Sequence, residues 1–319
     1  MHKLFVLFVF LLYAVTTIAQ QHKTVTQEIT VITDNDNYDF ELTDRYYSNG
    51  FIIQYNRMAK PTSNNVAKKI LRFEAAHKVY NPYVNNKSLQ DVLANMDRPY
   101  AGWLSASAGI TQIKTNQSVV QYGVIVGIMG PGARGRQIQN GWHKLIGIYP
   151  TFGWEYQLNN EAGFNLSADY YHSLLKAAPS KNISLHTVTR ATVGNTFTNA
   201  SAGLLLKTGW LNPENETGYW SGNLGSSSKN FKRNEFIFFL EPVLLYQAYN
   251  ATLEGGMFIK NKGVFTTGIK PLVFQTKTGI MLTGNRMGFR WYYTFRTREG
   301  SSMKTGEHWG SIGLTYRFQ

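Results

Sequence analysis

The stretch RMGFRWYYTFRTR, from Arg286 to Arg298, alternates between bulky apolar side chains and basic or hydroxyl side chains. One face carries Met287, Phe289, Trp291, Tyr293 and Phe295, and the other carries Arg286, Arg290, Thr294, Arg296 and Arg298. Alternation with a period of two residues is typical of a β-strand with one apolar and one polar face. The stretch is longer than the strands of a soluble sandwich, which usually have about five or six residues. It therefore favours a membrane-spanning strand with lipid on one side and a polar lumen on the other.

The same pattern recurs along the chain, as in SVVQYGVIVGIM (118–129) and SIGLTYRF (311–318). Length, aromatic content and interspersed glycines favour an outer-membrane barrel over a β-sandwich. The predicted fold is all-β: an antiparallel transmembrane β-barrel of about 12 strands with a short extracellular loop helix. The predicted strands cover 25–34, 48–58, 66–80, 102–115, 118–130, 161–174, 183–196, 198–210, 235–249, 270–283, 286–298 and 308–318.

Residues 1–19, MHKLFVLFVFLLYAVTTIA, combine an early lysine, an apolar stretch and a small-residue ending, which is typical of a secretory signal peptide. One β-barrel domain is expected over 20–319. That region has no run of 18 uncharged apolar residues that would predict a spanning helix. The chain has no cysteine, so a disulfide framework is excluded and stability must come from buried or membrane-embedded surface.

The formal net charge is +13, and loss of Lys3 with the signal peptide leaves +12 for the mature part. A strongly basic protein is expected to have anionic partners, such as phosphate-bearing lipid or nucleic acid. Export favours the lipid, so no nucleic-acid partner is expected. A monomer in the outer membrane of a Gram-negative bacterium is the predicted state.

If both chain ends are periplasmic, the connections between successive strands lie alternately on the outer side and on the periplasmic side. Three unusual segments, within 35–47, 81–101 and 131–160, then share the outer rim. The tight pairs Asn116-Gln117 and Gly284-Asn285 fall on the periplasmic side, where short turns belong. The connection 211–234 does not fit this rule, because it is long and polar yet periplasmic.

The third outer segment, RQIQNGWHKLIG, predicts a short helix in an otherwise β protein. Its apolar stripe consists of Ile138, Trp142, Leu145 and Ile146, and we expect this helix to dock on the barrel wall. Gln139 and His143 form an i,i+4 pair on a neighbouring face. Neutral histidine is the usual general base for ester hydrolysis, so His143 is the candidate base, although a rim histidine without a task has the same sequence signature.

The first outer segment supplies oxygen atoms. Asp34, Asn35, Asp36 and Asn37 offer several hard ligands within four residues, which suits calcium, although Asn/Asp clusters are also common in turns. Ser48 follows in YYSNGF, where it is expected to face the lumen or the rim, either as a site hydroxyl or as a small turn-flanking residue.

The motifs TDNDN with TDRYYSNGF, then YNPYVNNK, DRPYAGW and GPGARGRQIQNGWHKLIG, together resemble the lipid A deacylase family of Gram-negative outer membranes, the LpxR type that removes 3′-linked acyl chains. The resemblance spans nearly the whole mature chain. It implies a twelve-stranded barrel with a calcium-dependent ester hydrolase site at the outer rim, facing the outer leaflet and its lipid A or lipopolysaccharide substrate.

Carried over by position, the resemblance places the family's Asn-Asp pair on Asn35 and Asp36, its catalytic histidine on His143 and its loop lysine on Lys87. Its rim hydroxyl falls on Ser48, where some members have threonine. Asn35 and Asp36 are then the expected calcium-site residues, with Asp36 either binding the metal or orienting His143. Gln139 and Lys87 are expected to contact the substrate.

Two other functions remain open from the sequence. A lipopolysaccharide-binding or structural barrel would keep this scaffold without turnover. A serine-nucleophile phospholipase would use Ser48 as the attacking group and His143 as its base. A diffusion pore fits less well, because a wide lumen needs more strands than the sequence provides.

Overall fold

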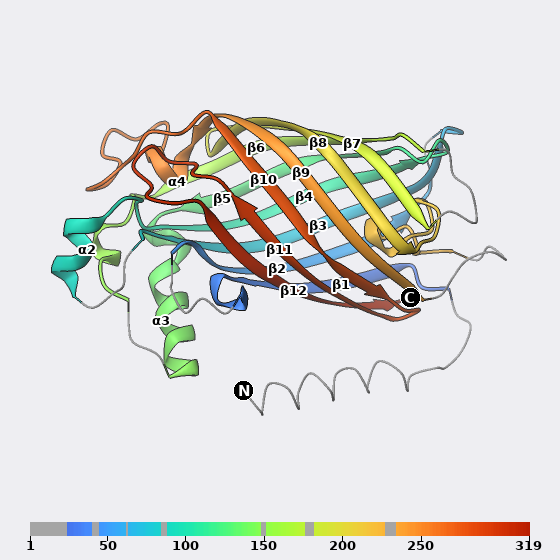
Figure 1. Cartoon of the computed structure of the whole chain (residues 1–319), viewed down its shortest axis with the longest axis horizontal. Coiled ribbons are helices and arrows are strands. Elements are labelled where there is room, and N and C mark those ends of the chain that lie inside the picture. The colour runs from blue at the N-terminus through green and yellow to red at the C-terminus, as the bar shows by residue number, and fades with distance from the viewer. Residues whose placement is uncertain are drawn as a thin grey trace.

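The computed structural model describes residues 24–39, 45–61, 63–83, 88–147, 151–175, 182–226 and 234–319. These ranges form a closed antiparallel barrel of twelve strands in which β1 pairs with β12 (Figure 1). This confirms the predicted fold. The predicted signal peptide lies outside the described residues, and so does Lys87. Within the described ranges, no helix has the length and apolar character needed to cross a bilayer.

The strands are long, from nine residues in β1 to 16 in β3 and β9. They are β1 (Gln27–Asn35), β2 (Tyr46–Ala59), β3 (Val66–Asn81), β4 (Ala101–Lys114), β5 (Val119–Met129), β6 (Glu161–Ser173), β7 (Ile183–Gly194), β8 (Phe197–Trp210), β9 (Glu235–Asn250), β10 (Leu272–Thr283), β11 (Met287–Arg296) and β12 (Glu307–Phe318). The short helices of the described ranges are η1 (Asp36–Asp39), α2 (Leu89–Asn95), η2 (Pro131–Ala133), α3 (Gly135–Ile146), η3 (Trp154–Tyr156), η4 (Gly218–Trp220) and α4 (Ala251–Glu254).

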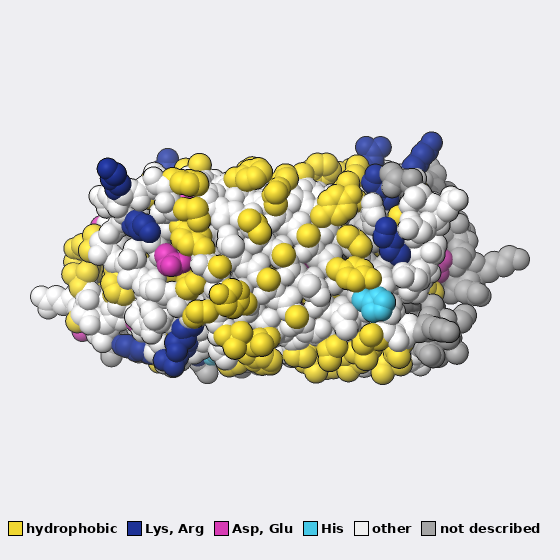
Figure 2. Space-filling model, turned by 90° about the horizontal axis from the view of Figure 1, so that it is seen from above, with side chains coloured by type: hydrophobic (Ala, Val, Ile, Leu, Met, Phe, Trp, Pro, Cys, Tyr) yellow, Lys and Arg dark blue, Asp and Glu magenta, His cyan; other side chains and the backbone are white. Residues whose placement is uncertain are grey.

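The outer wall of the barrel is apolar and the inner wall is polar. Along β5, for example, Tyr122, Val124 and Val126 are exposed, and they alternate with less exposed neighbours. Figure 2 shows apolar side chains spread over the middle of the barrel and basic side chains gathered towards its two ends. This distribution matches a barrel whose middle contacts acyl chains and whose ends meet charged headgroups.

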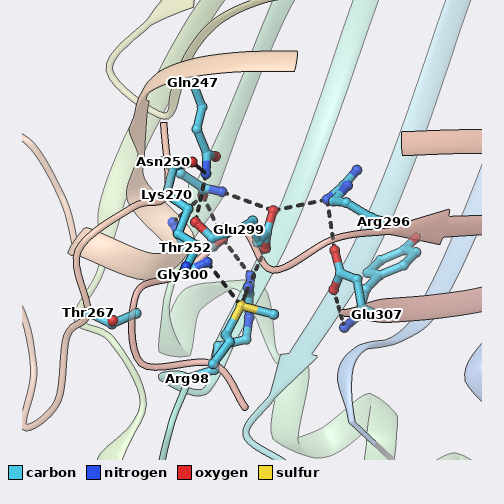
Figure 3. Close-up of polar contacts among 12 residues, drawn as sticks. Arg98, Gln247, Asn250, Thr252, Thr267, Lys270, Arg296, Glu299, Gly300 and Glu307 are labelled. Carbon is cyan, nitrogen blue, oxygen red and sulfur yellow. Dashed lines mark hydrogen bonds and ion pairs between the residues drawn. The ribbon is translucent and has the colours of Figure 1, made fainter. Parts of the chain in front are cut away.

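A buried ionic cluster closes the outer mouth (Figure 3). Arg98, from the β3–β4 connection, pairs with Glu299, from the β11–β12 connection. Arg296 Nη1 lies 3.0 Å from carboxylate oxygens of both Glu299 and Glu307. Arg98 also donates to Thr252 Oγ1 of α4 at 2.9 Å, so the cluster ties three outer connections together inside the barrel. Two positive and two negative side chains leave it without net charge.

The described part of the connection 211–234, which is long and polar although it is periplasmic, closes the periplasmic mouth. Its η4 turn places Trp220 against the inner wall, where the indole packs on Tyr171 with ring centroids 4.5 Å apart. Lys68 Nζ donates to the backbone oxygens of Gly222 and Leu224, both at 2.6 Å. The connection is therefore a plug, which explains its length and polarity on the periplasmic side.

Between the two closures lies a polar lumen cavity of about 330 Å³. Its lining includes the charged side chains Arg72, Glu74, Asp169, Lys277 and Arg290. Buried clusters of side chains occupy the barrel interior towards both of its ends, so the described residues do not outline the open lumen of a diffusion pore.

Candidate active site

The predicted site residues that the structure describes gather on the outside of the barrel wall, at the rim opposite the C-terminus (Figure 1). Asn35 ends β1 on the same face as Ile29 and Val31, which are exposed to the membrane side. Asn49 of β2 stands directly opposite Asn35, and the Asn35 amide donates to Asn49 Oδ1 at 2.7 Å. Two residues further along the same face of β2 is Phe51, which is 46% exposed. The polar rim thus begins about 7 Å above lipid-exposed side chains, at about 3.4 Å per residue.

Ser48 lies at a β-bulge between β2 and β3, where the register shifts between Tyr47 and Asn49. A bulge adds an unpaired residue and re-aims its side chain. Tyr47 faces the inner cluster with Trp309, whereas Ser48 is fully buried and its hydroxyl bonds Asn81 on the outer wall. Of the two expected placements of Ser48, the rim is therefore correct and the lumen is wrong.

Asp34 does not join its three neighbours. Its Oδ2 accepts a hydrogen bond from the Tyr47 hydroxyl at 2.7 Å on the inner side of the wall. Adjacent residues of a strand point to opposite faces, so Asp34 and Asn35 cannot share a site. The expectation of one ligand group over 34–37 is wrong for Asp34 and is restricted to the residues that follow it.

Asp36 opens the short helix η1, which packs on the outer wall beside β12. The close approach requires Gly310 in β12, because a Cβ atom there would lie 2.6 Å from Tyr38 Cβ. Asp36 is buried, and its Oδ2 accepts from the backbone N–H of Arg45 at 2.8 Å. The Arg45 guanidinium in turn contacts His308 of β12. These contacts fix the carboxylate at the rim end of β1.

Helix α3 is held against the outer wall at its start. Two glycines allow the contact: a Cβ atom on Gly135 would meet the Trp154 ring at 2.5 Å and Gly102 Cα of β4 at 3.2 Å. His77 of β3 donates from Nε2 to the Ala133 carbonyl at 2.7 Å, just before the helix begins. Gly147, with φ of 76°, ends the helix as a left-handed cap.

The face of α3 that meets the wall is polar. Gln139 and His143 are 0% and 1% exposed, respectively. Ile138, Trp142 and Leu145 of the apolar stripe are exposed. The side chain of Ile146 lies outside the described part of the structure. The helix itself is confirmed, but it docks through the Gln139–His143 row and not through its apolar stripe.

A single indole fixes the direction of the hydrogen bonds behind Gln139. Trp154 Nε1 can only donate, and it does so to Gln139 Oε1 at 2.8 Å. Asn81 Nδ2 donates to the same oxygen at 3.0 Å. Asn81 Oδ1 must then be an acceptor, and it takes the Ser48 hydroxyl proton at 2.9 Å. Gln139 Nε2 is left as a buried donor without a hydrogen-bond partner among the described residues.

The same chain of bonds continues to the end of β1. Asn49 Nδ2 donates to Ser48 Oγ at 3.3 Å, and Asn49 Oδ1 accepts from Asn35. Asn35 Oδ1 accepts from the backbone N–H of Asn37 at 2.7 Å, which shapes the start of η1. One network therefore connects α3 to η1 across the outer faces of β3, β2 and β1.

The course of α3 carries His143 in the same direction. Gly135 meets β4, and Gln139, one turn later, bonds Asn81 in β3. A helical turn advances about 5.4 Å and neighbouring strands are about 4.8 Å apart, so the next turn bears His143 towards β2 and β1. Figure 1 shows α3 running across the strand direction at the end of the barrel that also bears η1.

Sequence reasoning missed Asn49, Asn81 and Trp154, which link the predicted residues to one another. Asn81 lies in the YNPY motif, and the next residue, Pro82, marks the end of β3. A polar residue in the last outward position of an apolar strand was the available signal. No comparable signal exists for Trp154, because a lone tryptophan in a connection is as often part of a core.

The oxygen atoms near η1 fit a hard cation. Within the described ranges, no group of three or more His, Asp or Glu side chains is placed to hold a metal. A cation there would need amide, hydroxyl or backbone oxygens beside the Asp36 carboxylate, and calcium accepts such mixed oxygen ligands. Asn37 Oδ1 is buried and has no hydrogen-bond partner in the described structure, so it is one oxygen available for that purpose.

Fold and site together define an outer-membrane β-barrel with a polar site on its exterior wall, at the level where membrane meets water. The chain belongs to the LpxR family: the model of outer membrane protein LpxR matches residues 4–318. This is the lipid A deacylase family that the sequence motifs resemble, and it places the protein in the outer membrane.

The structure is similar to LpxR from Salmonella typhimurium, with a TM-score of 0.72 and 20% identity over 91% of this chain and 100% of that chain. At this identity the likeness concerns the fold alone. The translocator domain of the autotransporter NalP from Neisseria meningitidis is a more distant match, with a TM-score of 0.44 and 11% identity over 96% of this chain and 93% of that chain. No curated protein sequence matches the chain.

Proposed function

We propose that the protein is a lipid A 3′-O-deacylase, which hydrolyses an ester-linked acyl chain with water activated by His143. One observation carries the proposal: the buried amide of Gln139, one helical turn from the buried imidazole of His143, is joined by hydrogen bonds to the polar rim of β1 and β2, just above the lipid-exposed wall. An ester of lipid A lies at this level, because its acyl chain enters the membrane and its sugar phosphate does not.

The reaction needs a base near a bound water. Neutral His143 takes a proton from water as the water oxygen attacks the ester carbonyl carbon. The protonated imidazole then gives that proton to the sugar oxygen as the carbon–oxygen bond breaks. The products are a free fatty acid and a sugar hydroxyl, and His143 returns to its neutral form.

Negative charge develops on the carbonyl oxygen during the attack. Gln139 Nε2 is a donor suited to this oxygen, since it lacks a hydrogen-bond partner in the described residues while Gln139 Oε1 is held by two donors. A calcium ion held at Asp36, with Asn35 shaping its site, would polarise the same carbonyl as a Lewis acid. Asp36 either binds this ion or orients His143. Lys87 is proposed to contact a lipid A phosphate.

Water attack is favoured over a serine nucleophile by the network. The Ser48 hydroxyl donates to Asn81 Oδ1, so its proton points to the amide and away from a base. In our proposal Ser48 holds the rim of β2 in place and forms no covalent intermediate. A fluorophosphonate should therefore leave Ser48 unlabelled in an active preparation, and stoichiometric labelling of Ser48 would support the phospholipase alternative.

The test is lipid A mass in cells that express the protein. Wild type should produce lipid A lighter by one acyl or acyloxyacyl unit, and His143→Ala should produce none of it while remaining a folded barrel. His172→Ala is the matched control, because His172 lies near the periplasmic end of β6 and bonds Tyr170 there. Acyl release that survives in His143→Ala would remove the proposed base. Unchanged lipid A mass with wild type would favour the non-catalytic barrel.

Calcium dependence is tested separately by chelation. Acyl release should stop in EGTA and return on addition of calcium, and Asp36→Asn should show little such recovery. Full activity in EGTA would refute the metal role of the Asn35 and Asp36 region.

A further inference from the structure

Helix α3 exposes an apolar row that nothing in the described protein covers. Ile138 is 45% exposed, Trp142 39% and Leu145 76%. These residues are spaced at i, i+4 and i+7, so they form one continuous stripe. A stripe of this size is unusual on the water-exposed surface of a soluble protein.

The stripe adjoins the buried site row. At about 3.6 residues per turn, the Gln139–His143 row lies between the apolar row and a polar row. Arg136 and Lys144 of the polar row are both exposed. One edge of the site is therefore apolar and the other edge is basic, which is the order of groups around an ester that joins an acyl chain to an anionic headgroup.

The level of α3 on the barrel identifies what the stripe contacts. His77 holds the start of the helix, and it stands opposite Phe51 in β2 and Leu104 in β4. Phe51 and Leu104 are exposed residues of the apolar wall. The helix is thus anchored at the upper edge of the lipid-contacting surface, and its apolar row continues that surface outwards from the barrel.

We propose that α3 lies in the outer leaflet as an interfacial helix, with Ile138, Trp142 and Leu145 among the acyl chains and Arg136 and Lys144 at the anionic headgroups. This inference extends the proposed function, because it assigns the side of His143 from which an acyl chain enters. The substrate reaches the site by lateral diffusion in the membrane, and it does not pass through the lumen.

The absence of cysteine allows single spin labels to be placed without background. The barrel is reconstituted in vesicles of phosphatidylethanolamine and phosphatidylglycerol with added lipopolysaccharide. Labels at Ile138→Cys and Leu145→Cys are compared with labels at the adjacent positions Gln137→Cys and Lys144→Cys. Accessibility to oxygen, which concentrates in acyl chains, is measured against accessibility to a water-soluble nickel chelate.

The oxygen-to-nickel ratio should be severalfold higher at 138 and 145 than at 137 and 144. Equal, water-like ratios at all four positions would overturn the inference. Acyl release by the unlabelled protein is measured in the same vesicles. Water-like labels with full acyl release would refute the interfacial helix and leave the proposed function standing. High oxygen-to-nickel ratios at 138 and 145 without acyl release would refute the proposed function and leave the interfacial helix standing.

Discussion

Asn81→Asp replaces a donor by an acceptor at constant shape in the network behind the candidate site. The Asn81 amide donates to Gln139 Oε1 at 3.0 Å, and the side chain is 1% exposed. In the variant, a carboxylate oxygen faces that acceptor. Gln139 cannot turn over to relieve the conflict, because the Trp154 indole N–H would then face an amide N–H₂. The acceptor role towards Ser48 is unaffected.

The cost follows from a lost hydrogen bond and a buried group left without its partner, which together amount to about 1–3 kcal/mol. The barrel as a whole does not depend on this contact, so we expect the loss in the docking of α3. Local opening of the helix should become about 5- to 150-fold more frequent at neutral pH. Amide hydrogen exchange over Gly135–Ile146 reports this opening directly.

The effect should reverse in acid, because the introduced carboxyl can regain a donor by taking up a proton. Its pKa in the docked state should be raised by about 1–2 units above the usual value near 3.9, at 1.36 kcal/mol per unit. A raised pKa stabilises docking below the undocked value, and that contribution is lost as pH rises through the docked value. The variant should therefore approach wild-type protection at pH 4.5 and fall short of it at pH 8.

Asn140→Asp is the matched control. Asn140 lies on the same helix, and its Oδ1 accepts from Thr151 N at 3.0 Å and from Thr151 Oγ1 at 2.7 Å. A carboxylate keeps both bonds, so exchange should change little at either pH. Ratios of variant to wild type cancel the intrinsic pH dependence of exchange. Equal protection in Asn81→Asp and wild type at pH 8, or an identical loss at both pH values, would refute the assigned hydrogen-bond directions.

Four further outcomes are expected. Glu299→Gln leaves buried Arg98 without its counter-charge and should lower the unfolding free energy by about 3–5 kcal/mol. Thermal unfolding in detergent measures this loss. The double variant that also carries Arg98→Met should recover stability. Burial alone would raise the pKa of Glu299, but Arg98 and Arg296 hold that pKa below its ordinary value. The stability that the ion pair contributes should therefore be lost as pH falls below about 4.3. In that range, wild type should lose stability more steeply than Glu299→Gln. Trp220→Ala should weaken the periplasmic plug and so increase ion conductance in planar bilayers. Conductance of the variant equal to that of wild type would show that the plug does not depend on this indole. Gly310→Val should displace η1 through its contact with Tyr38 and reduce acyl release from a folded barrel, whereas full activity would show that η1 can shift without loss.

The sequence specified the barrel closely because each strand repeats one simple rule. Outward side chains meet acyl chains and inward side chains meet water or polar partners, so a period of two is imposed over nine or more residues. The predicted strand 286–298 differs from β11, Met287–Arg296, by one residue at its start and two at its end. The loop helix was equally legible, because the predicted segment RQIQNGWHKLIG, 136–147, differs from α3, Gly135–Ile146, by one residue at each end.

The face of each site residue was harder to predict. An apolar stripe on a helix normally marks the side that packs on protein, so the pattern alone does not predict that the stripe of α3 is exposed and its Gln139–His143 row buried. In our proposal the apolar environment of the stripe is the membrane. The bulge at Ser48 was also invisible, since one extra residue in a strand leaves no mark in composition. Asp34 and Asn35 look alike in sequence and are separated by the wall itself.

The two closures of the lumen have a consequence for the cell. Arg98 and Glu299 seal the barrel on the outside, and Trp220 seals it on the periplasmic side. A site that faces the leaflet does not need an open channel. Many copies of this protein would therefore not add open pores to the outer membrane that carries them.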